Sequence, residues 1–227
     1  VYIYRDTRVG QSRTATLGPA EVIGEVEVVG QGEAGVKGRA ADPAMYRIVA
    51  WSPYGGAELE FGHAVWFVGG AGAEVLLVGA PGDGTCGGMN SSGCGNSGAV
   101  YVLRRNATGA GAGEYARAGM FKAPTTISNA YFGYAGAAGG SLVAVGARNE
   151  DVSGVRCGAV HLYRWDGGTS TAAVSGGNAT LERSTAFAYE ASLAPPGKEA
   201  WQRFGVSVAV AVRGGGGTFQ MTAGAVG

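Results

Sequence analysis

Oxygen-bearing side chains that could bind a cation occur at two places, each shortly after a Gly-Ala dipeptide. Asp83 lies in "GAPGDGT", and Asn149, Glu150 and Asp151 lie in "GARNEDVSG". Ca²⁺ takes six to eight oxygen ligands, so these carboxylates and amides could contribute to a calcium site. Such residues more commonly form solvated turns. We therefore expect no metal or other cofactor, and we treat both segments as possible ligand loops.

The residues that could support catalysis are few. His63 and His161 lie far apart in strand-like runs, and His161 occupies the place that Tyr101 has in a similar segment. A packing role is the simpler interpretation of both histidines. No G-x-S-x-G motif occurs, Cys157 has no evident base nearby, and the glycines at 214–217 lack the Gly-Lys-Ser/Thr of a phosphate loop. The sequence therefore predicts no catalytic residue and no enzyme activity.

Cysteines and glycosylation motifs indicate an oxidising compartment. Cys86 and Cys94 lie in one loop rich in Gly, Ser and Asn, which predicts a small disulfide-closed loop. Two free surface thiols are the alternative, and the absence of CxxC spacing disfavours a metal site. Asn90, Asn106 and Asn178 each begin an Asn-X-Ser/Thr sequon in a polar, turn-like segment. Together these features predict an extracellular or cell-surface location reached through the secretory pathway.

Composition excludes several classes of partner. The chain of 227 residues has 44 Gly without a Gly-X-Y period, so it is not collagen-like. Its 17 basic and 17 acidic residues form no basic block, which gives no reason to expect nucleic acid or an anionic membrane as partner. No apolar run reaches the roughly 18 residues of a membrane span. The first residues, "VYIYR", resemble the middle of a strand, so we expect a fragment of a longer chain.

A pattern of Phe-Gly followed by two apolar segments recurs three times. Phe61-Gly62, Phe132-Gly133 and Phe204-Gly205 are spaced by 71 and 72 residues. After each come an apolar run, a Gly-rich turn and a second apolar run that ends in Gly-Ala. The Gly-Ala dipeptides are Gly79-Ala80 (followed by Pro81), Gly146-Ala147 and Gly224-Ala225. Glycine at these positions would permit tight turns and close backbone approach.

Two further strand-like segments belong to each unit. "SGAVYVLRR" (97–105) and "CGAVHLYRW" (157–165) follow the Gly-Ala dipeptides and alternate as strands do. A fourth segment precedes each Phe-Gly: "MYRIVAW", "YARAGMFKAP" and "AYEASLAPP". Four short strands in each unit predict an all-β protein, a β-propeller of four-stranded antiparallel blades.

These residues resemble the FG-GAP repeat, which is found in the β-propeller of integrin α subunits and in many secreted and surface proteins. The match is complete from Phe61 to Arg105 and weaker afterwards, since Arg148 and Val226 replace Pro81. The resemblance implies four-stranded blades, with about seven in a complete propeller. Many integrin blades carry an aspartate-rich calcium loop between the first two strands. The equivalent turns here lack aspartate, so the resemblance implies no calcium there.

The expected organisation is one partial propeller with parts of four blades. It comprises a blade end (1–6), an insertion (7–44), a blade (45–105), a second blade (115–165), a loop (166–185) and the start of a further blade (186–227). Phe61 is expected to fill the space between neighbouring blades. The loops 82–97 and 148–157 both join second and third strands, so we expect them on one face.

The function predicted from these features is binding or assembly. We expect a glycosylated module of a cell-surface or matrix protein that binds proteins or glycans, as in cell adhesion, and has no membrane span in this segment. Its other partner would be the remainder of its own chain. Two alternatives are a non-catalytic propeller domain of a secreted hydrolase and a structural subunit of an extracellular filament or sheath. Full-length sequence would separate them.

Overall fold

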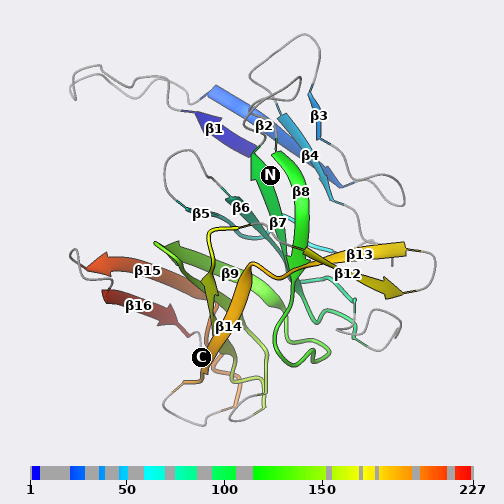
Figure 1. The fold of residues 1–227 in the computed structure, drawn as a ribbon. Coiled ribbons are helices and arrows are strands. Elements are labelled where there is room, and N and C mark those ends of the chain that lie inside the picture. Colours follow the sequence, from blue (N-terminus) through cyan, green and yellow to red (C-terminus); the bar gives the residue numbers. More distant parts are fainter. Residues whose placement is uncertain are drawn as a thin grey trace.

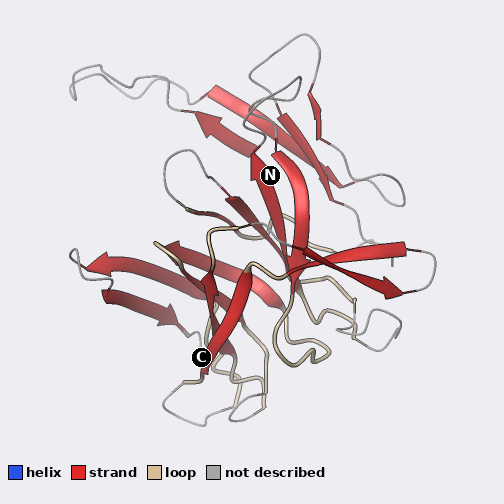
Figure 2. Ribbon diagram, viewed as in Figure 1, coloured by secondary structure: helices blue, strands red, loops and turns tan. Residues whose placement is uncertain are grey.

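The structure is a computed structural model in which every regular element is a β-strand. It describes residues 2–5, 21–28, 36–38, 46–50, 59–69, 75–85, 94–105, 115–151, 155–168, 171–176, 179–195, 200–213 and 218–225. No helix occurs within these ranges (Figures 1 and 2), so none of them offers a helix that could cross a membrane. The all-β expectation is confirmed.

The first central sheet is an antiparallel meander built from consecutive strands. It contains β5 (Val65–Val68), β6 (Val75–Ala80), β7 (Ala99–Arg105) and β8 (Tyr115–Phe121) in that spatial order. Every residue of β6 is buried, as expected for an inner strand covered on both faces. Consecutive antiparallel pairing needs only short connections, which suits the Gly-rich turns of this sequence.

The second central sheet repeats this order. It contains β9 (Phe132–Gly139), β10 (Leu142–Ala147), β11 (Ala159–Trp165) and β14 (Phe187–Leu193), all paired antiparallel. β10 is buried along its whole length, like β6. The third repeat supplies one antiparallel pair, β15 (Ser207–Arg213) and β16 (Thr218–Gly224), which begins as the other two sheets begin.

Two segments expected to be insertions contain strands. β12 (Thr171–Gly176) and β13 (Ala179–Ser184) form a hairpin within the segment predicted as a loop, and β13 joins the edge of β8 through one parallel pair. The N-terminal insertion supplies β2 (Glu21–Val28) and β3 (Val36–Gly38) to a separate sheet. Only β2 has an alternating apolar pattern, from Gly24 to Val28, that would favour a strand.

The N-terminal sheet has the order β1-β2-β4-β3 and includes β1 (Tyr2–Arg5) and β4 (Tyr46–Ala50). The sequence predicts that β1 ends one blade and that β4 begins the next. In the structure β2 lies between them and pairs antiparallel with β1 and parallel with β4. β4 therefore belongs to this sheet and not to the sheet that contains Phe61-Gly62.

The strand before each Phe-Gly pairs with the sheet that precedes it along the chain and not, as expected, with the sheet that follows it. β8 pairs with β7, so it belongs to the first central sheet. β14 pairs with β11, so it belongs to the second. The predicted boundaries 45–105, 115–165 and 186–227 do not match these sheets. The cause lies at the Phe-Gly turn, where Tyr131 and Gly133 have φ values of 57° and 88°. These left-handed conformations redirect the chain into the next sheet.

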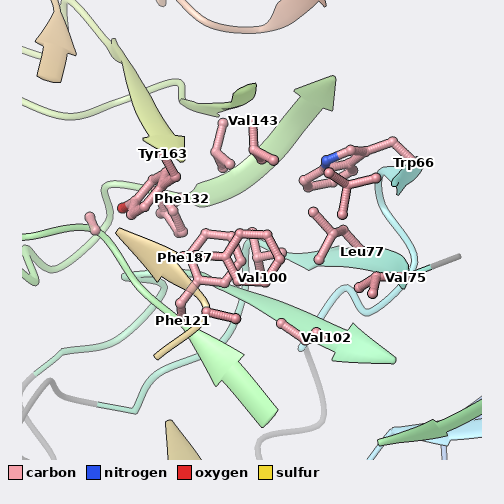
Figure 3. Close-up of a cluster of buried hydrophobic side chains, with 14 of the residues drawn as sticks. Trp66, Val75, Leu77, Val100, Val102, Phe121, Phe132, Val143, Tyr163 and Phe187 are labelled. Carbon is pink, nitrogen blue, oxygen red and sulfur yellow. The ribbon is translucent and has the colours of Figure 1, made fainter. Parts of the chain in front are cut away.

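The main hydrophobic core lies between the two central sheets. Figure 3 shows aromatic and branched side chains from both sheets converging on one another. The rings of Phe121 and Phe187 stack with centroids 4.8 Å apart, and Phe132 is fully buried beside them. A Cβ on Gly136 would overlap the Trp66 ring, which shows how closely β9 packs on the first sheet.

The Phe-Gly and Gly-Ala dipeptides meet where one sheet adjoins the next. The Phe132 amide donates to the Ser97 carbonyl at 3.1 Å, and Gly98 forms an isolated parallel bridge with Phe132. A Cβ on Gly79 would overlap the carbonyl oxygen of Gly133. We call this set of contacts the first junction. It explains why glycine stands at these positions, since a side chain would force the two backbones apart.

The second junction repeats the first. The Phe204 amide donates to the Cys157 carbonyl at 2.7 Å, and Gly158 bridges Phe204. A Cβ on Gly146 would overlap the carbonyl oxygen of Gly205. The pattern recognised in the sequence is therefore a repeated contact between successive sheets.

The remaining motif residues stay within their own sheet. The Gly62 amide donates to the Gly79 carbonyl at 2.9 Å, and the Phe61 ring packs edge-on against Tyr101 with centroids 5.3 Å apart. Phe61 thus covers the far face of its own sheet, and it is Phe132 that fills the space between sheets. Ala80, Pro81 and Ala147 are buried.

Candidate functional site

Asp83, one of the predicted ligand residues, is fully buried and surrounded by donors. Its carboxylate accepts hydrogen bonds from the Thr85 amide at 2.8 Å, the Tyr101 hydroxyl at 2.8 Å and the Lys122 ammonium at 3.0 Å. The Thr85 hydroxyl donates to the same carboxylate. These contacts tie the loop after β6 to β7 and to the end of β8. Both carboxylate oxygens therefore accept hydrogen bonds from buried groups of the first central sheet.

Charge and burial both act on this cluster. Burial alone would raise the pKa of Asp83, but the Lys122 charge and the hydrogen bonds from Thr85 and Tyr101 outweigh it and hold that pKa below its usual value. Burial lowers the pKa of Lys122, and Asp83 opposes that shift. Burial and the Asp83 charge raise the pKa of Tyr101 well above its usual value. The phenol therefore stays protonated and donates.

Glu150, the second predicted acid, is buried at the equivalent place in the second sheet. Its Oε2 lies 2.6 Å from Nε2 of His161, and Nδ1 of that ring lies 2.7 Å from the Ser192 hydroxyl. Asp83 and Glu150 each follow the glycine of Gly-Ala by four residues, and Tyr101 and His161 are each the third residue of their strand. The replacement of Tyr101 by His161 is visible in the sequence, but the pairing of His161 with Glu150 is not.

The other two predicted ligand residues do not join Glu150. The Asn149 amide donates to the Ala130 carbonyl at 3.2 Å. Asp151 is exposed, and its carboxylate accepts a hydrogen bond from the Arg156 amide. Among the residues that the structure describes, no three His, Cys, Asp or Glu side chains are grouped as a metal site would need.

The loops at the two junctions differ at their exposed rims. At the first junction the Asn129 amide donates to the Gly95 carbonyl at 2.8 Å, and the Asn96 side chain donates to that of Asn129 at 3.2 Å. The equivalent contact at the second junction joins the Trp201 amide to the Val155 carbonyl at 2.9 Å.

Large side chains occupy the rim of the second junction. The Arg156 guanidinium lies 4.7 Å from the centroid of the Trp201 ring. The exposed fractions of Val155 and Trp201 are 58% and 50%. We call Val155, Arg156 and Trp201 the rim patch. Trp201 was not predicted from the sequence, because the preceding repeat has Asn129 at the equivalent position and only the tertiary contacts show that the two positions correspond.

Arg148, which stands in the place of Pro81, has a different environment. Its guanidinium lies between the rings of Tyr131 and Tyr134, 4.5 and 4.3 Å from their centroids. The His63 ring packs against Tyr134 with centroids 4.2 Å apart, and His63 lies in the turn before β5 instead of in a strand. These contacts support the outer surface of the first junction.

Several predicted residues lie outside the described ranges. These are Asn90, Asn106, Asn178 and Cys86, so glycosylation and the Cys86–Cys94 disulfide stay predictions. Cys157 is buried and outside any disulfide, and its Sγ lies 3.6 Å from the Glu150 carbonyl.

The chain matches no family model and none of the curated proteins with which it was compared. The FG-GAP resemblance therefore stays a prediction based on the motif residues.

Proposed function

We propose that this chain is part of an extracellular, glycosylated β-propeller of the FG-GAP type that binds a protein or glycan partner through the rim patch. Two antiparallel meanders of four strands and the start of a third support the propeller, because the same contacts join them at two junctions. The β12–β13 hairpin extends the first meander to a sheet of six strands. The sequons and the Cys86–Cys94 pair support the extracellular location.

The observation that carries the proposal is the backbone conformation of Trp201. Its φ is 70°, a left-handed value that is unfavourable for a bulky residue. The equivalent Asn129 has φ 61°, which asparagine tolerates because its short polar side chain bonds locally. A half-exposed tryptophan therefore occupies a position where asparagine would be more stable. Strain of this kind at an exposed residue favours a functional role.

The chemistry of the rim patch suits recognition. Tryptophan and arginine are the residues that most often dominate binding energy at interfaces. The ring of Trp201 presents a large apolar face, and the stacked Arg156 offers donors to carboxylate, sulfate or carbonyl oxygens. The Trp201 amide is bonded to the Val155 carbonyl and the Arg156 amide to the Asp151 carboxylate. These bonds hold both residues in place before binding, which lowers the entropy cost of association.

The test is a comparison of Trp201→Asn with the unaltered chain. We expect the substitution to keep or raise the free energy of unfolding, since it relieves left-handed strain. Binding to a printed glycan array or to an array of extracellular matrix proteins should fall about 30-fold or more. Val212→Thr, which alters an equally exposed side chain on β15, is the matched control and should bind normally.

Three results would contradict the proposal. One is a Trp201→Asn chain that binds as well as the unaltered chain. Another is an equal loss of binding in Val212→Thr, which would show that any exposed apolar residue matters. The third is an unaltered chain that binds to nothing on either array.

A further inference from the structure

The side chains of Ser192, His161 and Glu150 form one hydrogen-bonded series that runs from β14 across β11 to the loop after β10. The Ser192 hydroxyl lies 2.7 Å from Nδ1 of His161, and Nε2 lies 2.6 Å from Glu150. An ionised carboxylate only accepts hydrogen bonds, so in the neutral ring Nε2 carries the proton and Nδ1 accepts from the serine. A serine nucleophile, its general base and an orienting acid need this arrangement.

We propose that Ser192 is the nucleophile of an acyl-transfer site that acts on simple carboxylic esters, with His161 as general base and Glu150 as positioning residue. This activity is independent of binding by the rim patch. It was not expected from the sequence, because Ser192 and His161 are 31 residues apart and no nucleophile motif surrounds the serine.

Burial is distributed as such a site requires. The side chains of His161 and Glu150 are 2% and 6% exposed, whereas Ser192 is exposed on β14. A substrate can therefore reach the hydroxyl while the base and the acid remain fixed behind it. The ring of Phe132 lies 5.6 Å from that of His161 and limits its movement.

A β-bulge brings a second hydroxyl to the serine. The pairing of β14 with β11 goes from Ala191 opposite Leu162 to Tyr189 opposite Tyr163, so Glu190 is an extra residue. Residues three apart on a regular strand point to opposite faces. With the bulge, the Tyr189 hydroxyl lies 2.8 Å from Ser192 Oγ and can donate to an oxyanion formed on the attached carbon.

The first sheet shows that the scaffold does not require this serine. His161 and Ser192 are opposite each other in the pairing of β11 with β14. The equivalent residues in the first sheet are Tyr101 and Met120, and Tyr101 donates to Asp83. A buried link between the acid after Gly-Ala and the third strand therefore forms without a partner hydroxyl on the fourth strand. Histidine in place of tyrosine adds a base, and serine in place of methionine adds a nucleophile.

The reaction that follows from this geometry has two balanced steps. Ser192 Oγ forms a bond to the ester carbonyl carbon while its proton passes to Nδ1 of His161. The carbon–oxygen bond to the alcohol then breaks, and the alcohol leaves with that proton. Water next attacks the acyl-serine, gives a proton to His161 and releases the carboxylic acid, and Oγ regains its proton from Nδ1.

The first test uses a fluorophosphonate probe, which forms an Oγ–P bond, expels fluoride and transfers the serine proton to the base. Peptide mass spectrometry should locate the probe on Ser192 and not on Ser207, which is also exposed and serves as internal control. Ser192→Ala should remove the label, and His161→Gln should slow labelling about 100-fold or more. Circular dichroism and urea unfolding would verify that each variant is folded.

The second test measures hydrolysis of p-nitrophenyl acetate. Glu150→Gln keeps an acceptor for Nε2 but removes the charge that stabilises the imidazolium. We expect a lower kcat with little change in KM, and a pH–rate profile with a lower midpoint. Equal labelling of Ser192 and Ser207, no labelling of the unaltered chain, or hydrolysis that persists in Ser192→Ala would each overturn the proposal. If His161→Gln does not fold, Ser192→Ala and Glu150→Gln still decide it.

Discussion

Gly79 and Gly133 approach so closely that a Cβ on Gly79 would overlap the carbonyl oxygen of Gly133. Gly146 and Gly205 stand in the same relation one repeat later. The glycine of each of the first two Gly-Ala dipeptides therefore fits the glycine of the next Phe-Gly, and the two sequence motifs form the two sides of one contact.

Gly79→Ala should lower the free energy of unfolding by about 3 kcal/mol, since the methyl group meets backbone that cannot move alone. Gly95→Ala is the matched control, because a Cβ there meets no atom within 4 Å. It should change stability by less than about 0.5 kcal/mol. Urea unfolding monitored by tryptophan fluorescence measures both. Similar values for the two variants would contradict the close approach.

Removal of Lys122 should be more damaging than removal of the whole ion pair. Lys122→Met leaves the Asp83 carboxylate buried without its cation and should cost about 3–5 kcal/mol. The double variant Asp83→Asn/Lys122→Met removes both charges and keeps an acceptor for Tyr101, so it should recover much of that loss. Denaturant unfolding of the variants tests this, and a double variant no more stable than Lys122→Met would refute it.

Stability in acid should depend on Asp83. The pKa of this carboxyl is below its usual value of 3.8, so the folded protein binds the proton less readily than the unfolded chain. Its contribution to stability is complete above pH 3.8 and is lost as the pH falls through the lower folded value. The double variant Asp83→Asn/Lys122→Met should lose less stability over that interval. Parallel acid-unfolding slopes for both proteins would show that Asp83 contributes nothing.

The three cysteines should differ in reactivity. Cys157 is in no disulfide but is fully buried, so it should react with a thiol reagent only after unfolding. Cys86 and Cys94 should react only after reduction, as expected for a disulfide. Alkylation with intact-mass detection, performed with and without urea and reductant, distinguishes these states. Alkylation of Cys86 and Cys94 in the unfolded but unreduced chain would exclude the disulfide.

The three sequons should carry glycans when the chain is made in a secretory host. Treatment with a peptide-N-glycosidase should reduce the intact mass and convert Asn90, Asn106 and Asn178 to aspartate. Replacing Thr108 with alanine should abolish modification at Asn106 alone and serves as a site-specific control. A mass unchanged by the enzyme would count against the extracellular location.

The strand content was predictable because it depends on local pattern. Apolar runs such as "VLLVGA" and "LVAVGA" became β6 and β10, and the alternating segments after each Gly-Ala became β7 and β11. Which strands pair with one another was less predictable. β8 follows β7 along the chain and precedes Phe132, so its position in sequence permits either sheet. Its pairing with β7, with the left-handed turn at Tyr131 and Gly133 after it, places it in the first sheet.

The candidate sites divide in the same way. The sequence by itself determined that acidic residues follow the first two Gly-Ala dipeptides of the repeat, that glycine recurs at fixed positions and that His161 replaces Tyr101. Only the tertiary structure decided that Asp83 bonds to Lys122, that Glu150 and Ser192 meet at His161, and that Arg156 stacks on Trp201. The period of the apolar residues predicts which face of a strand is buried, because the side chains of adjacent residues in the sequence point to opposite faces. Contacts between strands depend on register, bulges and junctions, and one extra residue such as Glu190 is enough to bring two hydroxyls together.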